Sequence, residues 1–244
     1  MHIALAFWGL TRSLTYTYPT IQKHILNVLK KHNITYTTFM HTYYLSTPYS
    51  NPRNNEHNIH LDNDEYKILN ADYIHREDQN DVRNSLNLET YRTHPDPWNT
   101  QYNTLDNFVI AMYSKQKVAQ LIKNSGKSFD YVIFLRPDVQ YVNDLNLEWF
   151  QLTSNTQICV PEFHCYTFKF NDRFAISTQE NAYHIGDAFY SMLEYSKQLP
   201  LHSETFHYNY TTSVLNLTVH YIPFYFNRVR ANGQINNDVS NYLN

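Results

Sequence analysis

The chain has 244 residues, of which 42% are hydrophobic and 16% aromatic, so it can bury the core of one large or two small domains. Its formal net charge of -3 excludes a nucleic-acid-binding protein that depends on a broad basic face. No apolar stretch has the length of a membrane span, and the opening residues lack the basic start and the cleavage site of a signal peptide.

The first fifty residues predict a βαβ unit. Residues 2–7 (HIALAF) form a short apolar strand, and Pro19 suits the first turn of the helix that follows. The hydrophobic residues that recur at helical spacing there are Ile21, Ile25, Val28 and Leu29. Asn33 can close this helix, and residues 34–45 have the β-branched and aromatic bias of a second strand. Such units build parallel sheets with helices on their faces.

The middle of the chain predicts a loop and then a long helix. Residues 46–65 are polar and rich in proline and asparagine, which is typical of a loop, and residues 66–78 predict a strand or a short helix. A turn at residues 94–98 (HPDPW) precedes the long helix, whose C-terminal cap we expect at Gly126. The apolar side of that helix consists of Leu105, Phe108, Val109, Met112, Ala119 and Ile122.

The second half alternates strands with helices. Residues 131–135 (YVIFL) are an uninterrupted apolar run, which predicts a central strand buried on both faces. Further strands are expected at residues 157–163, 169–176 and 219–230, and helices at residues 181–199 and 203–217. The pattern predicts an α/β fold, with a mostly parallel sheet flanked by helices, in one domain over residues 1–244.

The central strand stops abruptly at Arg136-Pro137-Asp138. Proline cannot donate to a sheet ladder and keeps the residue before it extended, so Arg136 and Asp138 should emerge at the carboxyl end of the strand. Ligands of open α/β sheets bind at that edge. A strand terminator without function would have the same pattern, so other residues must decide between the two interpretations.

Two familiar site types are not supported. Residues 125–128 (SGKS) end like a phosphate-binding P-loop, but Leu121 replaces the first glycine and the segment runs from helix to strand. His57 with His60, and Cys159 with Cys165, lack a second pair at zinc-ligand spacing. The two cysteines also make no disulfide framework, which favours a reducing compartment and hence a cytoplasmic protein.

Polar residues gather instead at the predicted strand ends. Trp8, Gly9 and Arg12 follow the first strand, where an aromatic ring could stack on a base and an arginine could bind phosphate. Asp138 offers oxygen ligands suited to magnesium or manganese. The remaining candidates are Asp172 and Arg173 before a later strand, Glu204 at a helix start, and Arg228 and Arg230 after an aromatic strand.

Several segments, in this order, resemble a known family: IALAFWGLTRS, FDYVIFLRPDVQY, NDRFAIST, HSETF and FNRVRANG. Together they are similar to small nucleotide-sugar glycosyltransferases of the GT-A fold, of the kind found in polysaccharide gene clusters and large DNA viruses. The resemblance implies a GT-A (Rossmann-like) sheet. In that family a D-x-D element after a central strand binds a divalent cation and the donor diphosphate. Asp138 matches the last aspartate, but Arg136 stands at the first, so an arginine could neutralise the diphosphate in place of the cation.

The resemblance implies transfer of a sugar from a nucleoside-diphosphate donor to a carbohydrate or glycoconjugate hydroxyl. The loop at Trp8, Gly9 and Arg12 would hold the nucleotide, and Asp172 or Glu204 would orient the sugar or take the acceptor proton. Between these two, we favour Glu204 as the base. Two alternatives stay open: a carbohydrate- or nucleotide-sugar-binding protein of the same fold without turnover, and a nucleotide-dependent phosphoesterase.

Overall fold

The computed structural model describes residues 1–165 and 167–242 of the chain, and a seven-stranded sheet forms its centre. The strand order is β10-β8-β9-β6-β1-β2-β5. The strands are β1 (His2–Trp8), β2 (Thr35–Tyr44), β5 (Tyr73–Asp78), β6 (Tyr131–Leu135), β8 (Gln157–Pro161), β9 (Phe174–Ser177) and β10 (Thr218–Ile222). Neighbours run parallel except at β9, which is antiparallel to both β6 and β8. The predicted α/β class with a mostly parallel sheet is confirmed.

The apolar run that predicted a central strand is β6, which lies between β1 and β9. Its side chains from Val132 to Leu135 are buried on both faces, and Ile133 is 0% exposed. A strand covered on both sides needs no polar alternation, because neither face meets water. The prediction for residues 131–135 is therefore confirmed.

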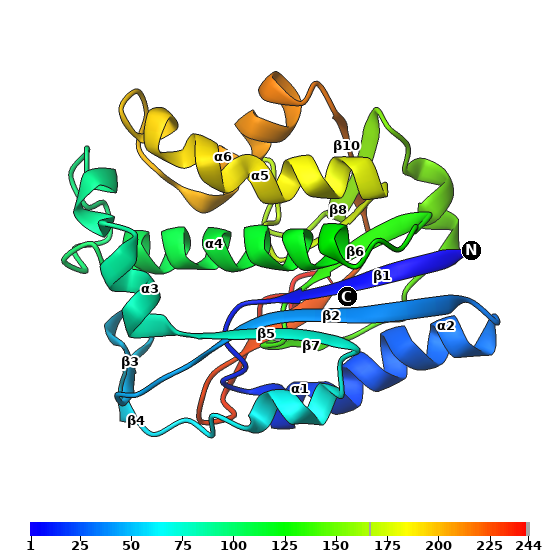
Figure 1. The fold of residues 1–244 in the computed structure, drawn as a ribbon, viewed down its shortest axis with the longest axis horizontal. Helices are drawn as coiled ribbons and strands as arrows, with labels where there is room; N and C mark the ends of the chain where they lie inside the picture. The colour runs from blue at the N-terminus through cyan, green and yellow to red at the C-terminus, as the bar shows by residue number, and fades with distance from the viewer. Residues whose placement is uncertain (166, 243–244) are drawn as a thin grey trace.

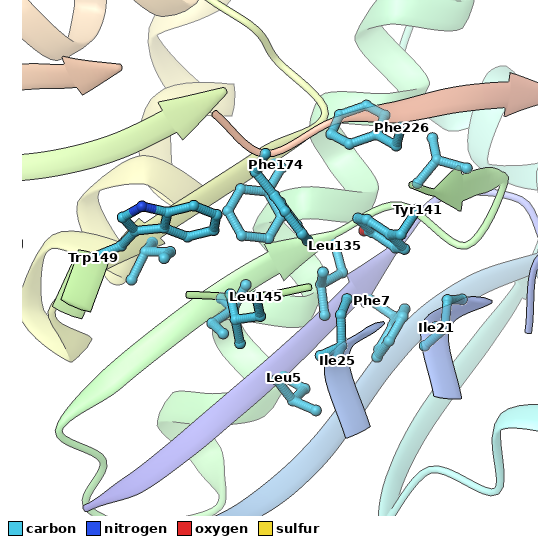
Figure 2. Close-up of a cluster of buried hydrophobic side chains, with 14 of the residues drawn as sticks. Leu5, Phe7, Ile21, Ile25, Leu135, Tyr141, Leu145, Trp149, Phe174 and Phe226 are labelled. Carbon is cyan, nitrogen blue, oxygen red and sulfur yellow. The ribbon is translucent and has the colours of Figure 1, made fainter. Parts of the chain in front are cut away.

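Helices cover both faces of the sheet (Figure 1). On one face lie α4 (Asn103–Asn124) and α5 (Gln179–Ser196), and on the other lies a continuous helical segment of α1 (Leu14–Ile21), a π-helical turn η1 (Gln22–Leu26) and α2 (Asn27–Lys31). Alternate residues of β1 serve the two faces, because successive strand side chains point in opposite directions. Ala4 and Ala6 belong to the same apolar cluster as the α4 side chains. Leu5 and Phe7 pack with Ile21 and Ile25 (Figure 2).

A second, three-stranded sheet extends the core on the α1 side. It consists of β7 (Val139–Tyr141), β11 (Phe226–Val229) and β12 (Ile235–Asn236), in the order β12-β11-β7. Tyr141 and Phe226 enter the same cluster as Leu135 and Phe174 (Figure 2). The prediction of one last strand over residues 219–230 is wrong, because the chain leaves the main sheet after β10 and continues as β11 in the small sheet. Pro223 lies at this break and cannot donate a ladder hydrogen bond.

Other boundaries also differ from expectation. The helix expected to start at Pro19 begins earlier, at Leu14, whose fully buried side chain joins the core and outweighs the local cost of an internal proline. The predicted loop 46–65 contains a small hairpin of β3 (Tyr49–Asn51) and β4 (Glu56–Ile59).

The remaining elements agree with the predictions in part. Residues 66–78 supply most of a 3-10 helix, η3 (Glu65–Leu69), and the edge strand β5. The strand expected at residues 169–176 is formed only by β9 at its end. The other helices and short turns are α3 (Gln79–Ser85), α6 (Ser203–Asn209), η2 (Pro52–Asn54), η4 (Leu88–Tyr91), η5 (Leu147–Leu152) and the π-helical η6 (Tyr210–Val214). In the described part of the chain, no helix combines the length and apolar character that crossing a membrane requires.

Helices α4 and α5 meet closely at Gly186. A Cβ atom placed there would lie 2.5 Å from the Cβ of Ala119, so an alanine forces the two helices apart. We expect Gly186→Ala to lower the free energy of unfolding by about 1–3 kcal/mol, although alanine favours a helix. Adding Ala119→Gly should recover most of that loss. Urea denaturation of both variants checks this, and a single mutant as stable as the parent chain would contradict it.

Candidate active site

All ten residues predicted as site residues line one cleft at the carboxyl ends of β1 and β6. The cleft has a volume of about 360 Å³. The ten residues are Trp8, Gly9, Arg12, Arg136, Asp138, Asp172, Arg173, Glu204, Arg228 and Arg230. The structure thus brings them together, and their individual roles stay predictions.

The antiparallel strand β9 explains why segments far apart in sequence share this cleft. In its register with β6, Phe174 lies opposite Leu135. The residues that follow Leu135 and those that precede Phe174 therefore emerge at the same edge of the sheet. Arg136 and Asp138 come from the first group, and Asp172 and Arg173 from the second.

The first loop is built around Gly9, whose φ of +98° is a conformation that side chains with a Cβ rarely adopt. Its backbone N–H donates to the hydroxyl of Ser114 on α4, at 2.8 Å. This bond ties the end of β1 to the long helix. The chain then turns so that Arg12 precedes α1 and points its guanidinium into the cleft wall.

Asp138 lies between two arginines and is only 1% exposed. Arg136 donates Nε to Oδ1 at 2.8 Å and a terminal nitrogen to Oδ2 at 2.5 Å, and Arg12 donates to Oδ2 at 2.9 Å. Burial would raise the pKa of Asp138, but Arg136 and then Arg12 outweigh it and lower that pKa to about 2. The carboxylate is therefore ionised and fully engaged.

This arrangement does not fit the cation site that a D-x-D element would provide. Both oxygens of Asp138 already accept guanidinium hydrogens, and the residue at the first aspartate position is itself a cation. A divalent ion needs several oxygen ligands with free lone pairs. In this structure Asp138 positions two arginines, and its binding of manganese or magnesium stays a prediction.

Two further arginines reach the cleft from the small sheet. Arg228 pairs with Val139, the residue that follows Asp138, in the antiparallel register of β11 and β7. Asp238 holds its guanidinium through bonds of 2.6 and 2.9 Å. Arg230 follows at the end of β11, and its Nε donates to Asn236 at 3.3 Å. The cleft wall is thereby rich in positive charge.

Asp172 and Glu204 form the acidic side of the cleft, with Arg173 between them. One guanidinium nitrogen of Arg173 lies 3.6 Å from Asp172, and another lies 3.7 Å from Glu204. Burial and the neighbouring Asp172 carboxylate raise the pKa of Glu204. Burial opposes the ionisation of Asp172, but Arg173 and His207 lower its pKa well below the ordinary value. Environments that separate two carboxyl pKa values in this way are typical of acid–base sites.

A buried network behind Asp172 was not predicted from the sequence. Lys115 of α4 donates to the Asp172 carbonyl at 3.2 Å, and its Nζ lies 2.9 Å from Nε2 of His207. Nδ1 of His207 lies 2.8 Å from the Ser203 carbonyl, and the Ser203 hydroxyl donates to the Asp172 carboxylate. The network holds Asp172 from both its backbone and its side chain. A polar residue at a core position of a helix is the only sequence signal that pointed to Lys115.

The charge of Lys115 gives stability a distinct dependence on pH. Burial lowers the pKa of Lys115 to about 7, whereas the pKa of a lysine in an unfolded chain is about 10.4. Between these values the unfolded chain binds more protons, so the free energy of unfolding rises with pH, by at most about 1.4 kcal/mol per pH unit. We expect Lys115→Met to lose this rise.

Urea denaturation at pH 7, 8 and 9 measures this effect. The matched control is Lys123→Met, which removes an exposed lysine from the same helix. It should keep the pH dependence of the parent chain. Equal slopes for Lys115→Met and the parent chain would show that Lys115 does not titrate in this range.

Several buried polar atoms of the cleft wall have no hydrogen-bond partner among the described residues. They are Nε1 of Trp8, Nε of Arg12, and Oδ1 of Asp172 with a terminal nitrogen of Arg173, which form an ion pair with each other at 3.6 Å but no hydrogen bond. Buried polar groups are almost always paired, because leaving one unpaired costs about 1–3 kcal/mol. Polar atoms of this wall that form no hydrogen bond within the protein are available to a polar ligand.

Trp8 does not offer a free ring to a nucleotide base. Its side chain is 2% exposed, and Lys115 and Arg136 lie over its ring at 4.3 and 5.3 Å from the centroid. The stacking role considered for Trp8 is therefore corrected. The ring packs in the core and gives two cations an aromatic surface.

The cleft mouth has aromatic residues that the sequence did not single out. Trp98 and His202 stack with ring centroids 5.6 Å apart, and Phe168 lies 3.9 Å from His202. Arg53 lies over Trp98 at 5.4 Å. Trp98 belongs to the HPDPW turn, and a tryptophan among turn residues was the available signal.

The similarity to known proteins lies in the fold and not in the sequence. No protein-family profile matches the sequence, and no curated protein does. Solved structures of glycosyltransferases are similar to it. Galactosyltransferase LgtC, in complex with donor and acceptor sugar analogs, is 13% identical with a TM-score of 0.44, over 86% of this chain and 69% of that one. Mouse xyloside xylosyltransferase 1, in its apo form, is 10% identical with a TM-score of 0.41, over 91% and 84%.

Proposed function

We propose that the protein transfers a sugar from a nucleoside-diphosphate sugar to a hydroxyl group of a carbohydrate or glycoconjugate. The observation that carries this proposal is the cleft wall, where arginines and two carboxylates of opposite pKa shift meet beside unpaired buried polar atoms. The motif order that resembles nucleotide-sugar glycosyltransferases gives the reaction class.

The diphosphate would bind at the arginine side. Among the described residues, six arginines line the cleft against the three carboxylates Asp138, Asp172 and Glu204. The arginines are Arg12, Arg53, Arg136, Arg173, Arg228 and Arg230. Guanidinium groups match phosphate oxygens in pairs and keep their charge at every physiological pH. The excess of positive charge would neutralise a diphosphate and stabilise it as a leaving group without a cation at Asp138.

The acceptor would be activated on the acidic side. In the transfer, the acceptor oxygen bonds to the anomeric carbon, the bond from that carbon to the diphosphate oxygen breaks, and the diphosphate leaves with the electron pair. The acceptor proton goes to a base. Glu204 suits that role, because its raised pKa makes it the stronger base of the two carboxylates. Asp172, which stays ionised, would hold the sugar or the developing positive charge.

A panel of nucleotide sugars tests the proposal. A matching donor should raise the melting temperature, because a ligand that binds only the native state stabilises it by mass action. Incubation with that donor should then release the nucleoside diphosphate and free sugar slowly, and faster with an acceptor. Binding without any release would identify a binding protein, and cleavage within the diphosphate would identify a phosphoesterase.

A further inference from the structure

A second polar cluster lies outside the cleft, where the edge strand β5 meets β2 and α4. His41 of β2 and His75 of β5 are direct partners in the parallel register. Glu77 follows His75 by two residues, so it points to the same face of the sheet. One ring nitrogen of each histidine and one carboxylate oxygen of Glu77 all lie within 4.8 Å of one another.

The hydrogen bonds around His41 orient its ring. The Ser114 hydroxyl accepts the Gly9 N–H at 2.8 Å, donates to the His41 carbonyl at 3.1 Å and lies 2.8 Å from Nδ1 of His41. A hydroxyl has one hydrogen. In the tautomer that keeps this hydrogen on the carbonyl, Nδ1 is the donor to the serine oxygen, and Nε2 carries the lone pair that a metal ligand needs.

That lone pair meets a second acceptor. Nε2 of His41 lies 2.9 Å from Oε2 of Glu77, and a carboxylate oxygen cannot donate. In this tautomer the two facing acceptors can share one metal ion, whereas in the other tautomer Nε2–H donates an ordinary hydrogen bond to Glu77. His41 is 0% exposed, so its side of the cluster is closed to solvent.

We propose that His41, His75 and Glu77 bind a divalent metal ion of the zinc type, with water completing its coordination. Two imidazole nitrogens and a carboxylate are ligands that zinc, cobalt and nickel prefer, whereas magnesium and manganese prefer oxygen alone. His75 and Glu77 are partly exposed, so an ion can enter from solvent.

The surroundings supply the outer contacts that metal ligands commonly have. Ser114 orients His41, and the hydroxyl of Tyr113 donates to Oε1 of Glu77 at 3.0 Å. Such partners fix ligand orientation and raise affinity. Among the described side chains that influence the His41 ring, Lys117 is the lysine or arginine whose positive charge opposes a bound cation. Its Nζ lies 4.9 Å from the Tyr113 ring centroid. A bound ion would fasten the edge strand β5 to β2 and, through Ser114 and Tyr113, to α4.

Zinc binding to the full chain, first stripped with a chelator and then dialysed, tests the site. Isothermal titration should show one saturable zinc ion per chain, and His75→Ala should weaken its binding at least tenfold. Glu77→Gln should do the same. The matched control combines His57→Ala and His60→Ala at the exposed β3–β4 hairpin, and it should bind zinc as the parent chain does.

Two further readouts separate lost ligands from lost folding. Cobalt in place of zinc should give the visible absorption of a nitrogen-bound tetrahedral ion in the parent chain only. Zinc should raise the melting temperature of the parent chain, but not that of His75→Ala or Glu77→Gln, whose circular dichroism without metal should be unchanged. Absence of saturable binding in the parent chain, or zinc binding by both ligand variants that is as tight as that of the parent chain, overturns the site. None of these measurements depends on sugar transfer.

Discussion

Replacing Glu204 with glutamine is expected to lower kcat by about a hundredfold to ten-thousandfold while donor affinity changes little. The amide keeps the size of the side chain and its place in the first turn of α6, but it cannot accept the acceptor proton. Initial rates with donor and acceptor, together with donor affinity from titration, measure the two quantities separately.

The pH profile adds a readout that a structural role would not change. Because burial and Asp172 raise the pKa of Glu204, activity should fall as pH decreases through a value above the ordinary 4.5. Glu204→Gln should lose that acidic limb. The matched control is Glu148→Gln, which removes an exposed carboxylate from the first turn of η5 and should leave both rate and profile unchanged. Full activity in Glu204→Gln would return Glu204 to the role of a helix-start residue.

Arg136→Ala should weaken binding of the donor diphosphate by about 1.5–3 kcal/mol, the scale of a hydrogen bond to a charged group. Inorganic pyrophosphate is a suitable probe, because it carries the diphosphate without any assumption about base or sugar. If guanidinium groups neutralise it, the affinity of the parent chain should be the same with manganese and with chelator. Arg76→Ala, which removes an arginine of β5 outside the cleft, is the control.

Asp138→Asn distinguishes an arginine-holding carboxylate from a metal ligand. The Asp138 carboxylate holds both Arg12 and Arg136, so its loss should weaken pyrophosphate binding equally with and without manganese. The variant should also be less stable, because two buried cations lose their partner. Tighter binding in manganese by the parent chain, lost in Asp138→Asn, would instead show that a cation binds there. Affinity unchanged in both Arg136→Ala and Asp138→Asn would mean that the segment only ends its strand.

Local patterns in the sequence identified most elements of the fold. The continuous apolar run of β6 and the helical spacing of apolar residues in α4 and α5 are patterns among residues close in sequence. They are therefore visible without knowledge of any tertiary contact. Proline was less reliable, because its meaning depends on packing. The helix that contains Pro19 begins before it, at the buried residue Leu14, whereas the strand ends before Pro223.

The polar residues after each predicted strand were visible in the sequence, and all ten candidates line one cleft. How they pair follows from the three-dimensional arrangement of the strands. Asp138 meets Arg12 across 126 positions, and Lys115 meets His207 across 92. Such pairs depend on strand order and on the antiparallel insertion of β9, which arise from long-range pairing that no local pattern records. For the same reason a carboxylate that looked like a metal ligand became the partner of two arginines, and two histidines 34 positions apart came to face one glutamate.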